Sequence, residues 1–79
     1  MVKPKLTKEE IILKKLGERI FDLRRKSGRS QTQFSYEMGW DKPNLRKIEK
    51  GKTNPTVKTL IKICEVLNIS LSELLKIDN

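Results

Sequence analysis

The chain has 79 residues, and its 18 lysines and arginines against 10 acidic residues give a formal net charge of +8. A chain of this length buries only ~60% of the surface that its unfolded form exposes, so we expect one small domain with one core. The sequence has no histidine and a single cysteine, Cys64, which excludes a zinc knuckle, a disulfide framework and a histidine-based catalytic pair. The composition therefore argues against an enzyme and predicts neither a metal site nor a cofactor.

The first residues, MVKPKLTKEE, are basic at the start but have no apolar run behind them, so we expect no signal peptide. The longest uninterrupted apolar run is the three residues Ile11–Leu13, which is too short to span a membrane. These features predict a cytoplasmic chain that makes no membrane contact.

The first predicted helix begins at a capping box, in which Thr7 and Glu10 satisfy each other's backbone amides. The apolar stripe behind it consists of Leu13, Leu16, Ile20 and Leu23. Gly28 ends this helix, because glycine readily takes the left-handed conformation of a helix C-terminus. Gly17 lies inside the helix at a cost of ~1 kcal/mol relative to alanine. We interpret it either as a close helix–helix contact or as the weak start of the domain.

Two short helices follow. The capping box Ser30–Gln33 predicts a helix that ends at Gly39. Asp41 is the next N-cap candidate, and Pro43 is tolerated in the first turn because amides there lack intrahelical partners. Pro43 is alternatively the first helical residue itself. Gly51 ends this third helix.

Thr56 caps a fourth helix, which ends at Asn68. Its predicted inner face carries Val57, Leu60, Ile61, Cys64 and Leu67. Cys64 is thus interpreted as a small core residue rather than a redox switch. A capping box at Ser70–Glu73 opens a final short helix that we expect to run to about Ile77. Because no alternating strand pattern occurs, the prediction is an all-α domain of five helices.

The stretch from Ser30 to Gly51 has the plan of a helix-turn-helix motif, two helices of about two turns joined by a short link. In the second of them, Leu45 and Ile48 point inward, with Glu49 at the edge of that stripe. The opposite face carries Lys42, Pro43, Arg46, Lys47 and Lys50. Residues 42–62 contain seven basic side chains and one acid, so the positive charge is concentrated here.

A basic helix face of this kind suits duplex DNA. Each lysine or arginine placed on a phosphate releases condensed counterions, and this release drives affinity. The major groove accommodates one α-helix, whose arginine and lysine side chains can bind guanine edges and whose asparagines favour adenine. The simpler alternative is a solvated helix surface, which most charged faces are. The caps and turns around this helix favour the DNA interpretation.

Several short pieces occur in a fixed order along the chain. They are LGERI (16–20), LR (23–24), SQ (30–31), Gly39, IEKGK (48–52), NP (54–55) and the segment 67–75. Together they make the chain resemble the Cro-like phage-repressor (XRE-type) helix-turn-helix family from about residue 16 to residue 75. The resemblance implies a compact five-helix, lambda-repressor-like DNA-binding domain in which helices 2 and 3 form the helix-turn-helix. We expect this domain to span residues 13–77, with residues 1–12 as an N-terminal arm and the start of helix 1.

The resemblance also implies site residues. The expected base contacts are Lys42, Pro43, Asn44, Arg46 and Lys47. The expected phosphate contacts are Ser30, Gln31, Lys50, Lys52 and Asn54. Arg24 and Glu49 match an ion pair that ties the first helix to the recognition helix, by which we mean the helix at about 42–50. Three alternatives stay open. Gln31 is also an ordinary helix former after a cap. Arg24 could be a surface residue beside Arg25, and Glu49 could pair with Arg46 one turn away.

The chain departs from the family pattern at several positions. Phe34 stands where the family prefers leucine, Ser35 and Cys64 where it prefers alanine, and Trp40 where a small aliphatic residue is usual. We interpret these as compensating volume changes in one core, which the helix pair survives. Pro43 is the more serious departure, because it removes a side-chain hydrogen bonder from a position expected to face a base.

These features together predict a transcriptional regulator that binds double-stranded DNA at a specific sequence. We expect it to act as a repressor and to be associated with the nucleoid. One recognition helix covers too few base pairs for specificity against a genome, so we expect a homodimer on a palindromic operator. A phage repressor, a restriction-modification controller and a type II antitoxin all fit this class. The sequence does not choose among them.

The alternative function is a protein-interaction module, such as an antitoxin or a polymerase-contacting helix-turn-helix protein, for which DNA binding is secondary. Its partner would be a toxin or a polymerase subunit, bound through Phe21, Tyr36 or the segment 69–77. The basic arm Lys3–Lys5 either wraps around DNA or is a frayed terminus.

Overall fold

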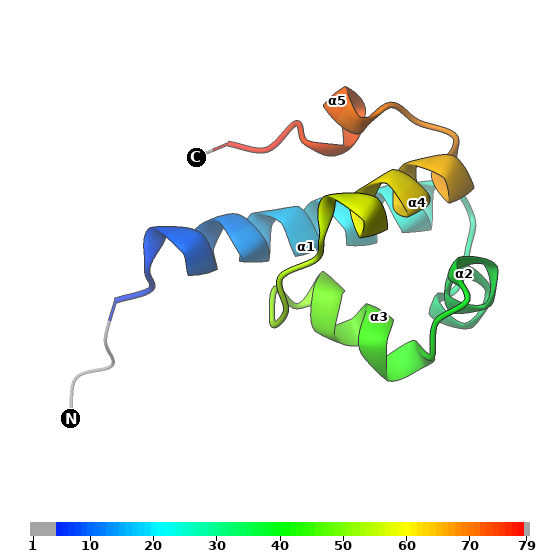
Figure 1. The fold of residues 1–79 in the computed structure, drawn as a ribbon, viewed down its shortest axis with the longest axis horizontal. Helices are drawn as coiled ribbons and strands as arrows, with labels where there is room; N and C mark the ends of the chain where they lie inside the picture. Colours follow the sequence, from blue (N-terminus) through cyan, green and yellow to red (C-terminus); the bar gives the residue numbers. More distant parts are fainter. Residues whose placement is uncertain (1–4, 79) are drawn as a thin grey trace.

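The computed structural model describes residues 5–78. These form five α-helices, which are α1 (Lys8–Lys26), α2 (Gln31–Met38), α3 (Lys42–Glu49), α4 (Val57–Leu67) and α5 (Leu71–Leu74). α3 lies along one side of the long helix α1 and α5 along the other, with α2 near the C-terminal end of α1 (Figure 1). The described residues contain no strand, so the predicted all-α, five-helix class is confirmed. The predicted arm at residues 3–5 lies outside the described residues except for Lys5, which is exposed.

The helix starts follow the predicted caps, but only one of the capping boxes is complete. At Thr7 both bonds are present, since its hydroxyl accepts the Glu10 amide at 3.1 Å and its own amide donates to the Glu10 carboxylate at 3.0 Å. The Ser30 hydroxyl accepts the Gln33 amide at 3.1 Å, but the Gln33 side chain donates to Glu37 instead of returning to the cap. The reciprocal half of that predicted box is therefore wrong.

The last capping box is also half formed. The Ser70 hydroxyl accepts the Glu73 amide at 3.0 Å, while the Glu73 carboxylate pairs with Arg19 and Lys76. Both cations lower the pKa of Glu73 below its usual value, and Lys76 has the larger effect. Asp41 occupies the N-cap position of α3 as predicted, but its side chain makes no capping hydrogen bond.

The predicted inner face of α4 is wrong at two positions. Val57 and Ile61 are 63% and 45% exposed, whereas Ile63, which the prediction omitted, is fully buried. The buried stripe of α4 runs through Leu60, Ile63 and Cys64, at the three- and four-residue spacing of one helix face. α4 carries more apolar residues than its neighbours can cover, so apolar character alone did not identify the covered face.

The last helix is shorter than predicted. α5 ends at Leu74 instead of near Ile77, because Leu75 leaves helical geometry and the Ile77 amide bonds to the Leu75 carbonyl at 2.8 Å. Ile77 still packs against the core from a non-helical segment, so its apolar character reflects burial and not helix formation. Within residues 5–78, no helix combines the length and the apolar character needed to cross a membrane.

The core draws on every helix. Five large side chains have essentially no exposed surface, one from each helix in turn, and they are Ile20, Phe34, Leu45, Ile63 and Leu74. Cys64 is buried beside them, and this burial raises the pKa of its thiol. The interpretation of Cys64 as a core residue is therefore confirmed. All five helices therefore pack around one shared core.

Gly17 allows α1 to touch the backbone at the end of α3. A Cβ at this position would clash with the Ile48 carbonyl oxygen and would lie 2.6 Å from the Glu49 carbonyl oxygen. Of the two interpretations of Gly17, the close helix–helix contact is the correct one. The missing side chain lets α1 support the C-terminal end of α3.

Replacing Gly17 should therefore push the two helices apart. Gly17→Ala should lower the free energy of unfolding by about 1–3 kcal/mol, as overpacking does, although alanine itself favours a helix by ~1 kcal/mol. Urea denaturation measures the change. Glu18→Ala, at the exposed neighbouring position, should change stability by less than about 0.5 kcal/mol. A Gly17→Ala variant as stable as the parent would contradict this contact.

Ser35 offers a second test of the core. Its side chain is buried at 3% exposure, and its hydroxyl has no hydrogen-bond partner among the described residues. Ser35→Ala removes that unsatisfied group and should raise the free energy of unfolding by about 1 kcal/mol. Thr32→Ala, on the exposed side of α2, serves as the control for helix propensity. If Ser35→Ala destabilised the protein while Thr32→Ala did not, the Ser35 hydroxyl would have to form a hydrogen bond in the folded protein, and the prediction would be wrong.

Candidate nucleic-acid interface

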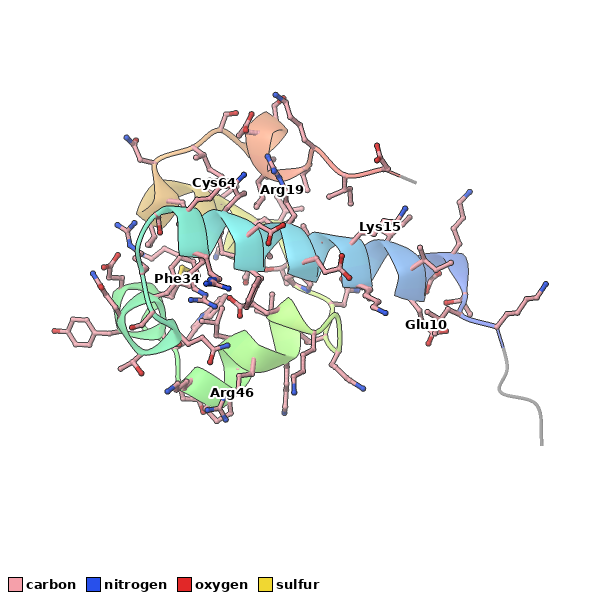
Figure 2. All side chains as sticks on the ribbon, turned by 180° about the vertical axis from the view of Figure 1, so that it is seen from behind. Glu10, Lys15, Arg19, Phe34, Arg46 and Cys64 are labelled. Atoms are coloured by element: carbon pink, nitrogen blue, oxygen red, sulfur yellow. The ribbon has the colours of Figure 1, made fainter. Side chains whose placement is uncertain are left out.

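The recognition helix α3 presents one face to the core and the other to solvent. Leu45, Ile48 and Glu49 are its buried residues. The five residues expected to contact bases, all of them exposed, are Lys42, Pro43, Asn44, Arg46 and Lys47. Arg46 lies on the edge of α3 that faces away from α1 (Figure 2). The structure thus brings the predicted base contacts together on one accessible surface.

The link between α2 and α3 determines the direction in which α3 leaves α2. Gly39 has a φ of 73°, a left-handed conformation that residues with a side chain rarely adopt. The next amide, of Trp40, donates to the Ser35 carbonyl at 2.8 Å, and the Trp40 ring packs partly against the core. These contacts end α2 and turn the chain into α3 within three residues.

A buried ion pair fastens α3 to α1. The Arg24 Nε donates to the Glu49 Oε2 at 2.7 Å and its Nη2 to the Glu49 Oε1 at 3.3 Å, with side chains only 7% and 4% exposed. Arg24 Nη1 donates in addition to the Arg29 carbonyl at 2.8 Å, at the turn between α1 and α2. The structure therefore contains the ion pair that the family resemblance implies, and Glu49 does not pair with Arg46.

Gln31 joins the same network. Its side-chain amide donates to the Glu49 Oε1 at 3.0 Å, so one carboxylate on α3 binds groups from both α1 and α2. An amide nitrogen carries two hydrogens, and this bond uses one of them. Ser30, the other predicted phosphate contact at this end of α2, is exposed and caps the helix. The family resemblance implies a phosphate contact for Gln31, but nothing in the sequence indicates its bond to Glu49.

The loop after α3 holds the other predicted phosphate contacts. Lys50, Lys52 and Asn54 are all exposed. The Lys52 amide donates to the Lys47 carbonyl at 2.8 Å, and Gly51 between the two lysines has a φ of 72°. This turn closes α3 and keeps two cations directly beside its C-terminal end.

Two ion pairs outside α3 were not predicted. Arg29 Nε lies 2.8 Å from Glu37 Oε2, and this bond, with a second from Gln33, lowers the pKa of Glu37. Arg19 Nη2 donates to the Glu73 carbonyl at 2.8 Å and to its carboxylate at 3.1 Å. The partners lie 8 and 54 residues apart in sequence, separations at which helix periodicity gives no signal.

Comparison with known proteins matches a model of the helix-turn-helix family to residues 20–74. The chain is 35% identical over 60 residues to the cryptic phage CTXphi transcriptional repressor RstR of Vibrio cholerae serotype O1, an alignment that covers 76% of this chain and 54% of the repressor. It is 36% identical over 61 residues to the ImmF control region 10 kDa protein of Bacillus phage phi105, covering 77% and 68%. The chain thus spans about half the length of RstR.

Solved structures give the same result. The restriction-modification controller protein C.AhdI from Aeromonas hydrophila superposes with a TM-score of 0.75 at 31% identity, over 78% of this chain and 94% of that one. SinR, described as the master regulator for biofilm formation and solved in complex with DNA, superposes with a TM-score of 0.70 at 34% identity, over 77% and 98%. SinR was also solved in a complex with the SinI protein.

The ion pair between Arg24 and Glu49 can be tested by a double-mutant cycle. Each single reversal, Arg24→Glu or Glu49→Arg, leaves a buried charge without its partner and should cost about 3–5 kcal/mol of stability. The double reversal should recover part of this loss, with a coupling energy within about 0.5–3 kcal/mol. Recovery will be incomplete, because Arg24 also binds the Arg29 carbonyl and Glu49 also binds Gln31. Urea unfolding of the four proteins measures the cycle, and additive losses would count against the pair.

Proposed function

This chain belongs to the helix-turn-helix (XRE-type) family of DNA-binding transcriptional regulators, and we propose that it is a repressor that binds a specific duplex sequence. Membership of this family agrees with the prediction that the chain is a regulator rather than an enzyme. Residues 13–77 are assigned as the DNA-binding domain, and residues 1–12 as an N-terminal arm with the start of α1. The protein acts in the cytoplasm on nucleoid DNA.

The observation that carries this proposal is the position of α3. Leu45, Ile48 and Glu49 are buried, while the cations, Pro43 and Asn44 are exposed. A helix held in this way can enter the major groove with its long polar side chains directed at base edges. The fold match to a regulator solved with DNA supports the same docking.

The assignment of individual contacts follows the exposed surface. The proposed base contacts are Lys42, Pro43, Asn44, Arg46 and Lys47. The proposed phosphate contacts are Ser30, Gln31, Lys50, Lys52 and Asn54. Pro43 has no hydrogen-bonding side chain, so it offers a base only apolar contact, as to a thymine methyl group. Gln31 binds phosphate with the amide hydrogen that its bond to Glu49 leaves free.

The protein binds as a homodimer to a palindromic operator. One domain of this size reads only a few base pairs, and two-fold pairing doubles the site at half-sites about one helical turn, or ~34 Å, apart. Selection of bound sequences from random duplex DNA, with sedimentation of the selected complex, tests this statement. A palindromic consensus with two chains bound supports it, and a single unpaired half-site with one chain bound would refute it.

Loss of the proposed base contacts should remove sequence preference. The double variant Lys42→Ala/Lys47→Ala should bind the selected operator little better than random duplex, a loss of ~10³-fold or more if it reaches the ordinary nonspecific level. Competition binding at fixed salt measures the ratio. The matched control Lys58→Ala/Lys62→Ala removes the same charge from exposed positions on α4 and should keep the preference. An unchanged preference in the first variant would overturn the docking of α3.

Tyr36 favours a second candidate function. This aromatic residue on α2 is 85% exposed, the largest exposure among the exposed large apolar side chains of the described residues. Such a side chain suits a protein partner, such as a toxin or a polymerase subunit, and a structural relative was solved with a protein bound. If this function is the main one, biological activity survives Lys42→Ala/Lys47→Ala and is lost in Tyr36→Ala.

A further inference from the structure

An open cleft lies where the N-terminal half of α1 meets the loop after α3. Its walls include Glu10, Leu13 and Lys14 from α1 and Lys50, Lys52 and Asn54 from the loop. The family match begins only at residue 20, so this part of α1 precedes the matched segment. The cleft therefore joins α1 residues of unassigned role to the loop proposed to bind phosphate.

Lys14 is held against that loop by direct backbone packing. A Cβ added to Gly51 would lie 2.6 Å from the Lys14 Cα and 2.8 Å from its backbone nitrogen. The loop can approach α1 this closely only because residue 51 is glycine. The Lys14 backbone is thus held beside the loop that carries Lys50 and Lys52.

The cleft is rich in cations that have no acidic partner. Lys14, Lys50 and Lys52 are exposed, and within residues 5–78 none of them takes part in an ion pair. The acid among the lining residues is Glu10, whose carboxylate accepts the Thr7 amide at 3.0 Å. Three cations thus face one anion that is already bound at the helix cap.

The other side of α1 has a balanced charge. A second depression there is lined by three cations and three acids, which are Lys15, Arg19, Lys76, Glu18, Asp22 and Asp78. Lys15 projects from the edge of α1 opposite to α3 (Figure 2). Lys14 and Lys15 are neighbours in sequence, yet only Lys14 lies on the cationic side.

We propose that Lys14 is a further DNA-contacting residue, which binds a backbone phosphate adjacent to the phosphates bound by Lys50, Lys52 and Asn54. This inference rests on the proposed function. Phosphates follow one another closely along a strand, so a strand that lies along the loop presents a further charge next to it. The N-terminal turns of α1 then form part of the DNA interface, and they lengthen the contact along the backbone without reading bases.

The salt dependence of operator binding tests this contact. Each phosphate contact contributes ~0.9 to the slope of log affinity against log salt. Lys14→Ala should reduce the slope by about this amount, so that its affinity deficit at about 50 mM salt shrinks some three- to four-fold by 200 mM. Lys14→Arg should keep the parental slope, and Lys15→Ala, which removes the same charge one residue away, should keep it as well.

A second measurement locates the phosphate. Operators with one neutral methylphosphonate at each flanking position in turn should weaken binding by the parent at the phosphates bound by Lys50, Lys52 and Asn54 and at one further, adjacent phosphate in each half-site. Neutralising that further phosphate should not weaken binding by Lys14→Ala, whereas neutralising the other phosphates should weaken both proteins. Circular dichroism and thermal unfolding check that the variants are folded.

Failure of this inference differs from failure of the proposed function. If the parent binds no duplex DNA at low salt, the proposed function falls and Lys14 falls with it. If the parent binds its operator but Lys14→Ala keeps the parental slope, only the role of Lys14 is overturned. An equal loss of slope in Lys14→Ala and Lys15→Ala would also overturn it, since the effect would then come from net charge alone.

Discussion

The buried carboxylate of Glu49 is the interaction on which the arrangement of the first three helices depends. It accepts hydrogen bonds from Arg24 on α1 and from Gln31 on α2, while its own backbone belongs to α3. Desolvation offsets much of the Coulomb gain of such a pair, so it contributes little net stability. Its effect is to allow one relative position of the three helices. A helix that reads base edges needs a fixed orientation, and this network provides it.

Two glycines let the backbone approach α1 where a side chain would prevent it. Gly17 lies on α1 itself and admits the carbonyl groups at the end of α3. Gly51 lies in the following loop and packs on the backbone of Lys14. α1 therefore supports both the C-terminal end of the recognition helix and the loop behind it. Because the two contacts lie on successive turns of one rigid helix, α3 and its loop form a single surface.

Helix starts, the ends of the first four helices and the exposed face of α3 could be predicted because their signals are local. For example, α4 begins after Thr56 and ends at Asn68, as expected. The covered face of α4 could not be predicted, since Val57 and Ile61 are as apolar as buried Ile63 and only the neighbouring helices decide which are covered. The bond from Gln31 to Glu49 escaped prediction because it joins residues 18 apart whose proximity is a result of the fold. Conversely, the pairing of Arg24 with Glu49 was predictable only through the family resemblance.

Burial of Glu49 also determines the electrostatics of the interface. It is the only acid among residues 42–62, and it is withdrawn from the surface and paired with Arg24. Every exposed formal charge from residue 42 to residue 62 is consequently positive. The residue that fixes the orientation of α3 thus also removes the negative charge that would oppose a phosphate backbone. Geometry and charge at the interface therefore have a common cause, and a substitution at Glu49 would disturb both together.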